Sequence, residues 1–399
     1  MSAHRFLVEP IETVVFGQPR SFIAGEAHRT KSDFPPSPFA FQGLVRSQLL
    51  RGAVPLLDLD DWSDAARAER AALVGGPDAL PQGWQLKGPY PARWVRDEEG
   101  EFCIEPWVPA PRFLLRHGNS AIHLREVRST HPGLDDLGAD RPLYGRPGLG
   151  NLELLGGWVG PEILRFALAG ERRVESRPVW QWAAGLPPFV HNELQPGLAL
   201  DRCSATARHG LLYFLGALRF EERSGLFGSL RATLDSRLRP EAIESGLGAA
   251  GRKGRAVRFH AVERLHPTWE RIVSGDHLPE EPDDGACFWL LTLTPVPGTA
   301  QLRLAPPPGV HCEVVAKLAG PPRVLGGYRM DTARARPNQH YFPAGSAWLF
   351  QVTGGTSADR RACIHQLHDA HPFGPPEQAT FGFGHTLVGI GPATTEEGP

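Results

Sequence analysis

The sequence predicts an α+β fold with mainly antiparallel sheets. Two observations carry this prediction. Short segments of alternating apolar residues, typical of strands, occur in both halves of the 399-residue chain, and only a few segments have helical spacing. In addition, 39 prolines and 45 glycines predict long, stiffened loops between short strands. The chain is long enough for two domains of ordinary size.

The N-terminal half begins with strands and continues into a capped helix. Residues 4–10 alternate as a strand, and residues 12–16 and 20–25 are interpreted as a hairpin. The segment 33–52 follows, with the sequence DFPPSPFAFQGLVRSQLLRG. Its prolines favour an extended start, Ser37 is a good N-cap, and the apolar residues that follow share one helical face.

The rest of the chain continues the mixture of helices and strands. Residues 63–76 predict a second, more exposed helix, and residues 80–160, rich in Pro, Gly and Trp, are interpreted as insertions. In the second half, residues 228–238 predict a helix among several strands. Because both halves begin with strands, we place a boundary near residue 200, giving domains of residues 1–200 and 201–399.

Composition excludes several classes of protein. Hydrophobic residues make up 41% and charged residues 22%, as in globular proteins. No apolar run approaches the ~18 residues of a membrane span, and the N-terminus lacks the layout of a secretion signal, so we expect a cytoplasmic protein. The five cysteines lack CxxC spacing, which argues against a disulfide framework and a thiolate zinc site. They are Cys103, Cys203, Cys287, Cys312 and Cys363.

The net charge of −2 predicts no general attraction to polyanions, but the charges are unevenly distributed. Residues 251–259 and 329–336 are basic, whereas residues 57–61 and 279–284 are acidic. A local basic groove on a near-neutral body is one interpretation of this pattern, and solvated surface charge is the other.

The helix predicted in 33–52 is a candidate anion site. Gln42 and Arg46 are four residues apart and share one stripe, and Gly43 beside them leaves a shallow dent. The N-terminus of a helix also presents backbone N–H groups to an anion. The structural alternative is an enclosed hinge between strand and helix.

A second candidate lies in the glycine-rich segment GLGAAG, residues 246–251. It matches the dinucleotide pattern GxGxxG, but a helix-like segment precedes it and a strand follows, so the context is reversed and we reject that site. A flexible glycine loop with Arg252, Lys253 and Arg255 remains, which is suited to gripping phosphates. A solvent-exposed hairpin loop is the alternative.

Residues 363–374, CIHQLHDAHPFG, are a candidate metal site. Here Cys363 is followed by three histidines, of which His365 and His368 have a spacing that one metal ion accepts. No zincin pattern accompanies them. We therefore interpret these two histidines and His371 as ordinary residues of a polar loop, and we expect neither a metal nor a cofactor.

The segment TFGFGHTLVGIGP, residues 380–392, predicts a glycine-aromatic loop before an apolar strand. Its glycines allow the backbone to approach a partner closely. Phe381 and Phe383 are candidates to stack on bases, and His385 is a candidate to contact a phosphate or act as an acid. A tight hairpin with core phenylalanines is the competing interpretation.

Taken in order, six segments resemble one family, the tag-binding subunit of Cmr-type (type III-B) CRISPR effector complexes. Two departures from the family pattern occur: the adjacent glycine pair of its Leu-Gly-Gly-x-Gly-Arg motif is absent, and Tyr328 stands in place of tryptophan. The last segment resembles the C-terminal glycine-rich loop of the RAMP superfamily. The six segments are residues 9–25, 34–50, 198–220, 246–259, 325–352 and 381–391.

The resemblance implies two ferredoxin-like (RRM-like) domains with large loop insertions, and a subunit that holds the 5′ tag of the guide RNA without cutting RNA. It implies two protein partners, the large polymerase-like subunit and the first backbone subunit. We expect the glycine-bearing turns and the first helix to converge on one cationic furrow. The RNA-binding residues would be Arg20, Ser37, Gln42, Gly43, Arg46, Arg252, Lys253, Arg255, Arg329, Arg334, Arg336, Gly382, Phe383, Gly384 and His385.

Two alternatives keep a role in RNA biology. The equivalent tag-binding subunit of the Csm-type (type III-A) complex would share fold and role. A RAMP endoribonuclease that processes repeat RNA would use a histidine such as His4, His28 or His385 as its acid–base catalyst.

A third alternative, from another class, is a sugar-binding or carbohydrate-active protein. It would use Trp180, Trp182 and Glu193, which lie close together in the sequence. We disfavour it because such tryptophans are more often core residues, and no second carboxylate is evident.

Overall fold

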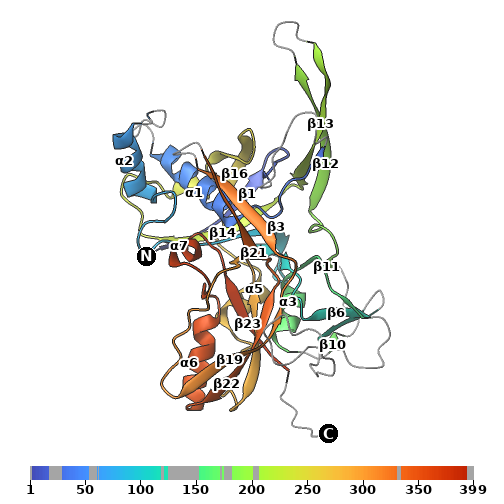
Figure 1. Cartoon of the computed structure of the whole chain (residues 1–399), viewed down its shortest axis with the longest axis vertical. Helices are drawn as coiled ribbons and strands as arrows, with labels where there is room; N and C mark the ends of the chain where they lie inside the picture. Colours follow the sequence, from blue (N-terminus) through green and yellow to red (C-terminus); the bar gives the residue numbers. More distant parts are fainter. Residues whose placement is uncertain are drawn as a thin grey trace. The chain divides into compact units, whose positions relative to one another are not determined.

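The structure is a computed structural model of the chain. It describes residues 2–17, 29–53, 61, 63–117, 121–124, 152–170, 173–174, 182–200, 206–329 and 334–392. These residues form an α+β fold in which nearly all neighbouring strands are antiparallel, as predicted (Figure 1). No helix in the described part of the chain is long and apolar enough to cross a bilayer.

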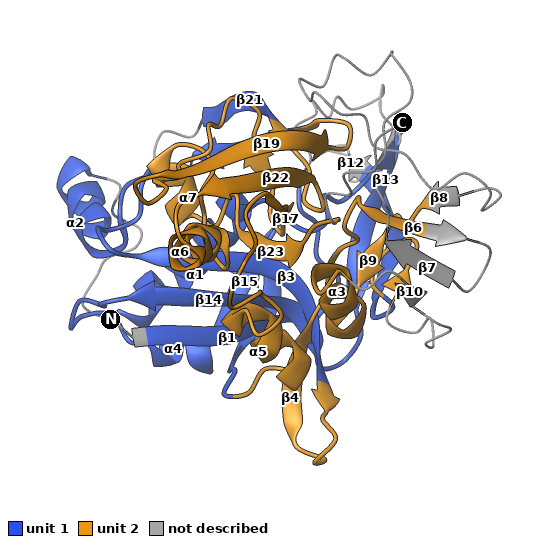
Figure 2. Ribbon diagram, turned by 90° about the horizontal axis from the view of Figure 1, so that it is seen from below, with its two compact units in different colours: residues 1–94, 188–263, 324–340 blue, residues 95–187, 264–323, 341–399 orange. Residues whose placement is uncertain are grey.

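The chain divides into two compact units, each assembled from three separate stretches (Figure 2). Unit 1 comprises residues 1–94, 188–263 and 324–340, and unit 2 comprises the stretches between and after them. The predicted division into continuous halves at residue 200 differs from this, because the first strand pairs with strands that lie beyond residue 220.

Unit 1 contains the strands and helices of the N-terminal stretch, together with those of its two later stretches. Its elements are β1 (Ser2–Pro10), β2 (Arg29–Thr30), α1 (Pro38–Gly52), α2 (Asp64–Val74), β3 (Gln85–Arg96), β12 (Val190–Leu200), β13 (Ala207–Phe220), β14 (Ser224–Ala232), α4 (Glu241–Glu244), β15 (Leu247–Ala250), β16 (Arg255–Ala261), β20 (Arg323–Arg329) and β21 (Arg334–Phe342). Strands β3, β20 and β21 extend one or two residues past its boundary.

The core of unit 1 lies between α1 and an antiparallel sheet with the strand order β15–β16–β1–β14–β3. Phe6 from β1 stacks on Phe41 from α1 and packs beside Phe259 from β16, with ring centroids 6.0 Å apart in both pairs. Gly228 on β14 leaves room for the Phe41 ring, since a Cβ there would lie 2.5 Å from it. This packing fixes α1 against the sheet.

Unit 2 contains the remaining elements. They are β4 (Phe102–Pro106), β5 (Val108–Pro109), β6 (Leu114–His117), β7 (Ala121–Leu124), β8 (Leu152–Leu154), β9 (Trp158–Val159), α3 (Pro161–Leu168), β10 (Arg173–Val174), β11 (Trp182–Ala183), α5 (Pro267–Ser274), β17 (Ala286–Thr292), β18 (Val296–Pro297), β19 (Val310–Leu318), β22 (Ala347–Gly354), α6 (Ser357–Leu367), α7 (Pro376–Thr380) and β23 (Thr386–Ile390).

A four-stranded antiparallel sheet with the order β19–β22–β17–β23 forms the centre of unit 2. Phe288 from β17 and Phe350 from β22 stack with centroids 5.7 Å apart, and Ile364 and Leu367 of α6 belong to the same buried cluster. The predicted insertion, residues 80–160, supplies most strands of two smaller sheets in the same unit, and β10 and β11 complete them. Its first part is not an insertion, because residues 85–96 form β3 in the sheet of unit 1.

One predicted helix is wrong. Residues 228–238 were expected to be helical, but residues up to Ala232 continue β14, and a turn follows. The stretch pairs with β1 on one side and β3 on the other, so tertiary pairing overrides the local helical spacing. In the predicted hairpin of residues 12–16 and 20–25, Val14 instead bridges to Leu218 of β13. Residues 20–25 lie outside the described part of the chain.

Candidate nucleic-acid interface

A groove with a volume of about 960 Å³ lies in unit 1, and we call it the arginine groove. Helix α1, α2 from Arg67 onward, the loop after α2 and the β20–β21 pair line it, together with Gly17, Asp33, Ser37 and Gly251. Its charged lining consists of five arginines and one aspartate, so the lining has an excess of positive charge although the chain is nearly neutral. These residues are Asp33, Arg46, Arg67, Arg70, Arg329 and Arg336.

Helix α1 lines the arginine groove along most of its length, from Phe39 to Leu50. Ser37 is the N-cap, and its hydroxyl accepts a hydrogen bond from the Ala40 N–H at 3.3 Å. Because Pro38 has no N–H and Ala40 is capped, few backbone donors remain there for an anion. The predicted cradle of helix N–H groups is therefore reduced, and side chains supply most of the positive potential.

Gln42 and Arg46 interact as their four-residue spacing predicts. The buried Gln42 side chain donates to the Phe39 carbonyl at 3.0 Å and accepts from Arg46 Nη1 at 2.9 Å. Arg46 Nη2 also donates to the Gly75 carbonyl in the loop after α2. The Arg46 guanidinium is thus held in one orientation on the groove wall.

Helix α2 adds two arginines that the sequence interpretation missed. Arg67 and Arg70 line the arginine groove, three residues apart on one face, and Arg67 pairs with Asp64 at 3.5 Å. The helix had been interpreted only as exposed. The three-residue spacing of these arginines places them on one face of the helix, which the sequence does show. The neighbouring residues do not show that this face lines a groove with α1.

Strands β20 and β21 form another wall of the groove, with the side chains of Arg329, Arg336 and Tyr328. The Arg336 guanidinium lies 4.8 Å from the centroid of the Phe39 ring. Arg336 and Arg329 both pair with Asp78, at 2.8 and 3.1 Å. Tyr328 also lines the groove, and 60% of its surface is exposed.

The predicted glycine loop is a strand followed by a four-residue turn, residues 251–254. Gly251 has φ +64°, and a Cβ there would lie 2.5 Å from the Val15 carbonyl oxygen, which only glycine accommodates readily. Gly251 lines both the arginine groove and a smaller cavity beside the α1 N-terminus, which Arg252 also lines. Arg255 instead pairs with Glu12 at 2.5 Å.

The predicted RNA-binding residues therefore separate into three groups. Those that line the two cavities of unit 1 are Ser37, Gln42, Gly43, Arg46, Arg252, Arg329 and Arg336. Lys253, Arg255 and Arg334 are outside that lining, and Arg20 falls outside the described residues. The third group is the segment of residues 382–385, which belongs to unit 2.

The structure favours the core interpretation for the segment around residues 381–385. Phe381 and Phe383 are almost completely buried, and Phe383 stacks on Tyr341 with centroids 5.1 Å apart. His385 is 2% exposed, and its Nε2 lies 2.8 Å from an Asp369 carboxylate oxygen. These rings occupy the interior instead of presenting faces to bases, so we do not carry them into the proposed site.

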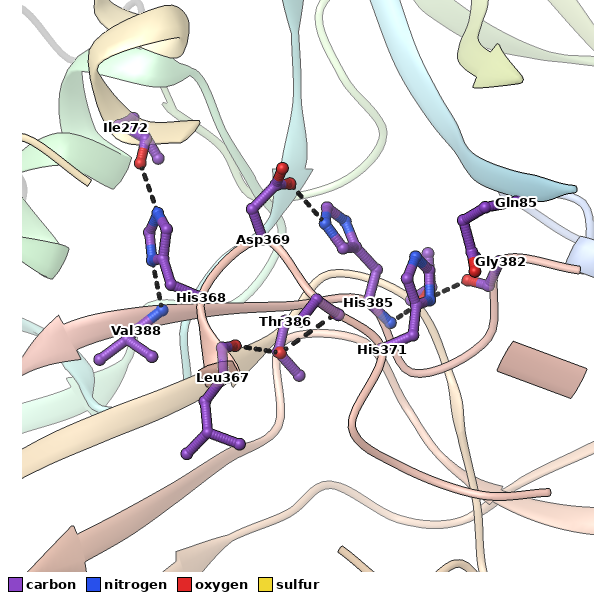
Figure 3. A network of polar contacts seen from close by, with 12 residues as sticks. Gln85, Ile272, Leu367, His368, Asp369, His371, Gly382, His385, Thr386 and Val388 are labelled. Carbon is purple, nitrogen blue, oxygen red and sulfur yellow. Dashed lines mark hydrogen bonds and ion pairs between the residues drawn. The ribbon is translucent and has the colours of Figure 1, made fainter. Parts of the chain in front are cut away.

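The same part of unit 2 contains a network of buried histidines (Figure 3). His368 Nε2 donates to the Ile272 carbonyl at 2.8 Å, and its Nδ1 accepts from the Val388 N–H at 3.1 Å. The nearby His277 Nε2 donates to the Val388 carbonyl at 2.7 Å. These bonds attach β23 to α5 and the residues after α6.

The candidate metal ligands of residues 363–374 do not form a metal site in the described chain, where no group of three or more His, Cys, Asp or Glu side chains is arranged for one. Cys363 is buried and shares a hydrogen bond with Cys312. His365 lies in α6, and His368 follows as its C-cap. The four described cysteines carry free thiols.

The residues named for the alternative functions are engaged elsewhere. His4 pairs with Glu244 at 2.9 Å, and Glu193 pairs with Arg219 at 2.6 Å. Trp182 donates its indole N–H to the Gly156 carbonyl at 2.7 Å. His28 and Trp180 lie outside the described residues.

Comparison with known proteins places the chain in a family. The family model described as "CRISPR-associated protein (Cas_Cmr3)" matches residues 6–391. No curated protein matches the chain.

Several solved structures show weak similarity. A cryo-EM structure of the Type III-B Cmr-beta bound to cognate target RNA matches at 14% identity, with a TM-score of 0.43 and coverage of 86% of each chain. The Csm3–Csm4 subcomplex of a type III-A CRISPR-Cas interference complex matches at 10% identity and a TM-score of 0.35, covering 86% of this chain and 92% of that one. Scores this low do not bear on what the chain binds.

Proposed function

The chain belongs to the Cas_Cmr3 family of CRISPR-associated proteins, and on this premise we propose that it holds the 5′ tag of the guide RNA in a type III-B effector complex. It acts there as a binding subunit without catalysis. Its protein partners are the large polymerase-like subunit and the first backbone subunit, and its two units correspond to ferredoxin-like domains.

The observation that carries this proposal is the charge of the arginine groove. Five arginines and a single aspartate line one cavity on a chain whose net charge is −2. Guanidinium groups bind phosphate oxygens through paired hydrogen bonds, and a concave basic surface attracts a polyanion. A groove of this kind fits the backbone of an unpaired RNA end.

The aromatic side chains in the groove support single-stranded RNA over duplex RNA. Tyr328 is 60% exposed on the groove wall, and unpaired bases stack on such rings. In an RNA duplex the base faces are covered by their neighbours, so an exposed ring has no base face to contact. Phe39 is engaged instead with Arg336, which leaves Tyr328 as the stacking surface that we assign.

Replacing Arg46 by alanine tests the proposal. In the assembled complex we expect tagged guide RNA to bind about tenfold more weakly, because a charged hydrogen-bond donor contributes roughly 1.5 kcal/mol. The salt dependence of log K should fall by about 0.7 for the lost phosphate contact. Filter binding at several salt concentrations measures both.

The matched control is Arg51→Ala, which removes the same charge from the exposed end of the same helix, outside the groove lining. It should bind as the wild type does. Guide RNA that lacks the tag should be insensitive to Arg46→Ala. Equal weakening with and without the tag would remove the groove from tag recognition.

A further inference from the structure

Three of the five arginines in the groove are engaged by one short segment, Gly75–Asp78, which follows α2. Arg46 donates to the Gly75 carbonyl, and Arg336 donates to the Pro77 carbonyl. The Asp78 carboxylate contacts two arginines at once, with one oxygen 2.8 Å from Arg336 Nη1 and the other 3.1 Å from Arg329 Nη1. One acidic side chain therefore bridges two cations on the groove wall.

Arg336 is fixed more firmly than the carboxylate that it contacts. The Arg336 side chain is only 14% exposed, lies against the Phe39 ring, and crosses Gly327, where a Cβ would lie 3.2 Å from its Cδ. The Asp78 side chain, in contrast, is 62% exposed. Exposed ion pairs contribute little, about 0–1 kcal/mol, so another anion can replace Asp78 at low cost.

A carboxylate that bridges two guanidinium groups occupies the position that two oxygens of a phosphate would take. We propose that Arg329 and Arg336 form a phosphate-binding pair for the RNA backbone, and that Asp78 holds this pair until an RNA phosphate displaces it. The proposal rests on the function proposed above and deepens it. Asp78 thereby lowers the affinity of the groove for stray anions, because each must compete with it.

The variant Asp78→Asn tests this directly, since it removes the competing charge and keeps the size of the side chain. We expect the full-length chain to bind a fluorescein-labelled, single-stranded RNA with the tag sequence about two- to fivefold more tightly, the fold-change that corresponds to an exposed ion pair. Fluorescence anisotropy at low and moderate salt measures it. Asp78→Glu keeps the charge and should not tighten binding.

A charge-matched control excludes a general electrostatic effect. Glu222 is an exposed acid of unit 1, in the turn between β13 and β14 and outside the groove lining. Glu222→Gln changes the net charge by the same amount and should leave the affinity unchanged. Equal tightening by Glu222→Gln and Asp78→Asn would overturn the proposal.

The variant Arg329→Ala removes one arginine of the pair instead of the aspartate. It leaves the packing of Arg336 on Phe39 undisturbed. We expect about tenfold weaker binding and a salt slope reduced by about 0.7. In the double variant with Asp78→Asn, the gain from Asp78→Asn should shrink. An undiminished gain, or a wild-type slope in Arg329→Ala, would contradict the pairing.

A scrambled RNA of the same length and composition separates the two proposals. If the tag RNA and the scrambled RNA bind equally while Asp78→Asn tightens both, the phosphate pair is supported and tag recognition fails. If the tag RNA is preferred and Asp78→Asn changes neither affinity, the phosphate pair fails and tag recognition stands.

Discussion

Replacing Arg67 and Arg70 together by alanine is expected to weaken binding of the tagged guide RNA on the order of 100-fold. Both side chains line the arginine groove from one face of α2. Each charged donor contributes roughly 1.5 kcal/mol to a phosphate contact, so two contribute about 3 kcal/mol. The salt slope of log K should fall by about 1.4, the value for two phosphates of a single strand. Titrations of the assembled complex at several salt concentrations give both quantities.

Two control variants separate the effect of the phosphate contacts from the effect of charge alone. Arg67→Lys with Arg70→Lys keeps the charges and should retain most of the salt slope while losing affinity, because lysine cannot bind phosphate through a planar pair of donors. Arg51→Ala with Arg239→Ala removes two exposed arginines of unit 1 outside the groove lining and should have no effect. Wild-type affinity in the alanine variant of α2 would show that this wall does not contact RNA.

Acidification below pH 6.5 is expected to destabilise unit 2 through His368. Burial, with a further contribution from His277, lowers the pKa of His368 to about 4 from its ordinary value of 6.5. Protonation would also place a hydrogen on Nδ1, which accepts the Val388 N–H. Between pH 6.5 and 4 the unfolded chain binds a proton that folded unit 2 does not, so the free energy of unfolding falls as the pH is lowered.

The size of this effect follows from the difference in pKa. A folded pKa of about 4 against 6.5 corresponds to about 3 kcal/mol of stability. This stability is fully present above pH 6.5 and is lost as the pH falls to 4. Urea unfolding at a series of pH values measures it. His368→Gln keeps a hydrogen-bond donor and an acceptor but does not titrate. Between pH 6.5 and 4, its free energy of unfolding should therefore fall less steeply with pH, by the slope that corresponds to one proton. A variant profile parallel to that of the wild type would contradict the account.

Local signals predicted several elements well. Ser37 followed by Pro38 and an apolar stripe predicts a helix start, and α1 begins at Pro38 and ends at Gly52. Residues 63–76 were likewise predicted to be a helix, and α2 spans Asp64–Val74 with Ser63 as its N-cap. These signals succeed because capping and proline geometry act within a few residues, where the sequence contains all the interacting groups.

Elements set by distant pairing were harder to predict. Residues 228–232 have helical spacing, but β14 lies between β1 and β3 and takes its conformation from both. For the same reason, two units made of three stretches each cannot be inferred from a composition boundary. Alternating apolar residues show that a strand exists, but they do not identify its neighbours.

The candidate site was predicted in part. Gln42 and Arg46 were identified from their spacing, and the structure joins them by a hydrogen bond at 2.9 Å. Arg67 and Arg70 were missed, because the face that α2 turns toward α1 depends on the loop between them. Phe383 was expected in the site because aromatic residues beside glycines suit RNA, but identical residues also build a buried turn, which is what the structure contains.

The central claim, that the arginine groove of unit 1 holds the tag, is tested most directly by photo-crosslinking. A guide RNA with 4-thiouridine placed in turn at each tag position is assembled into the complex and irradiated, and the crosslinked peptides are identified by mass spectrometry. We expect crosslinks to α1, α2 and the β20–β21 wall, with a crosslink at Tyr328 that is lost in Tyr328→Ala. Tag crosslinks confined to peptides outside that groove would contradict it.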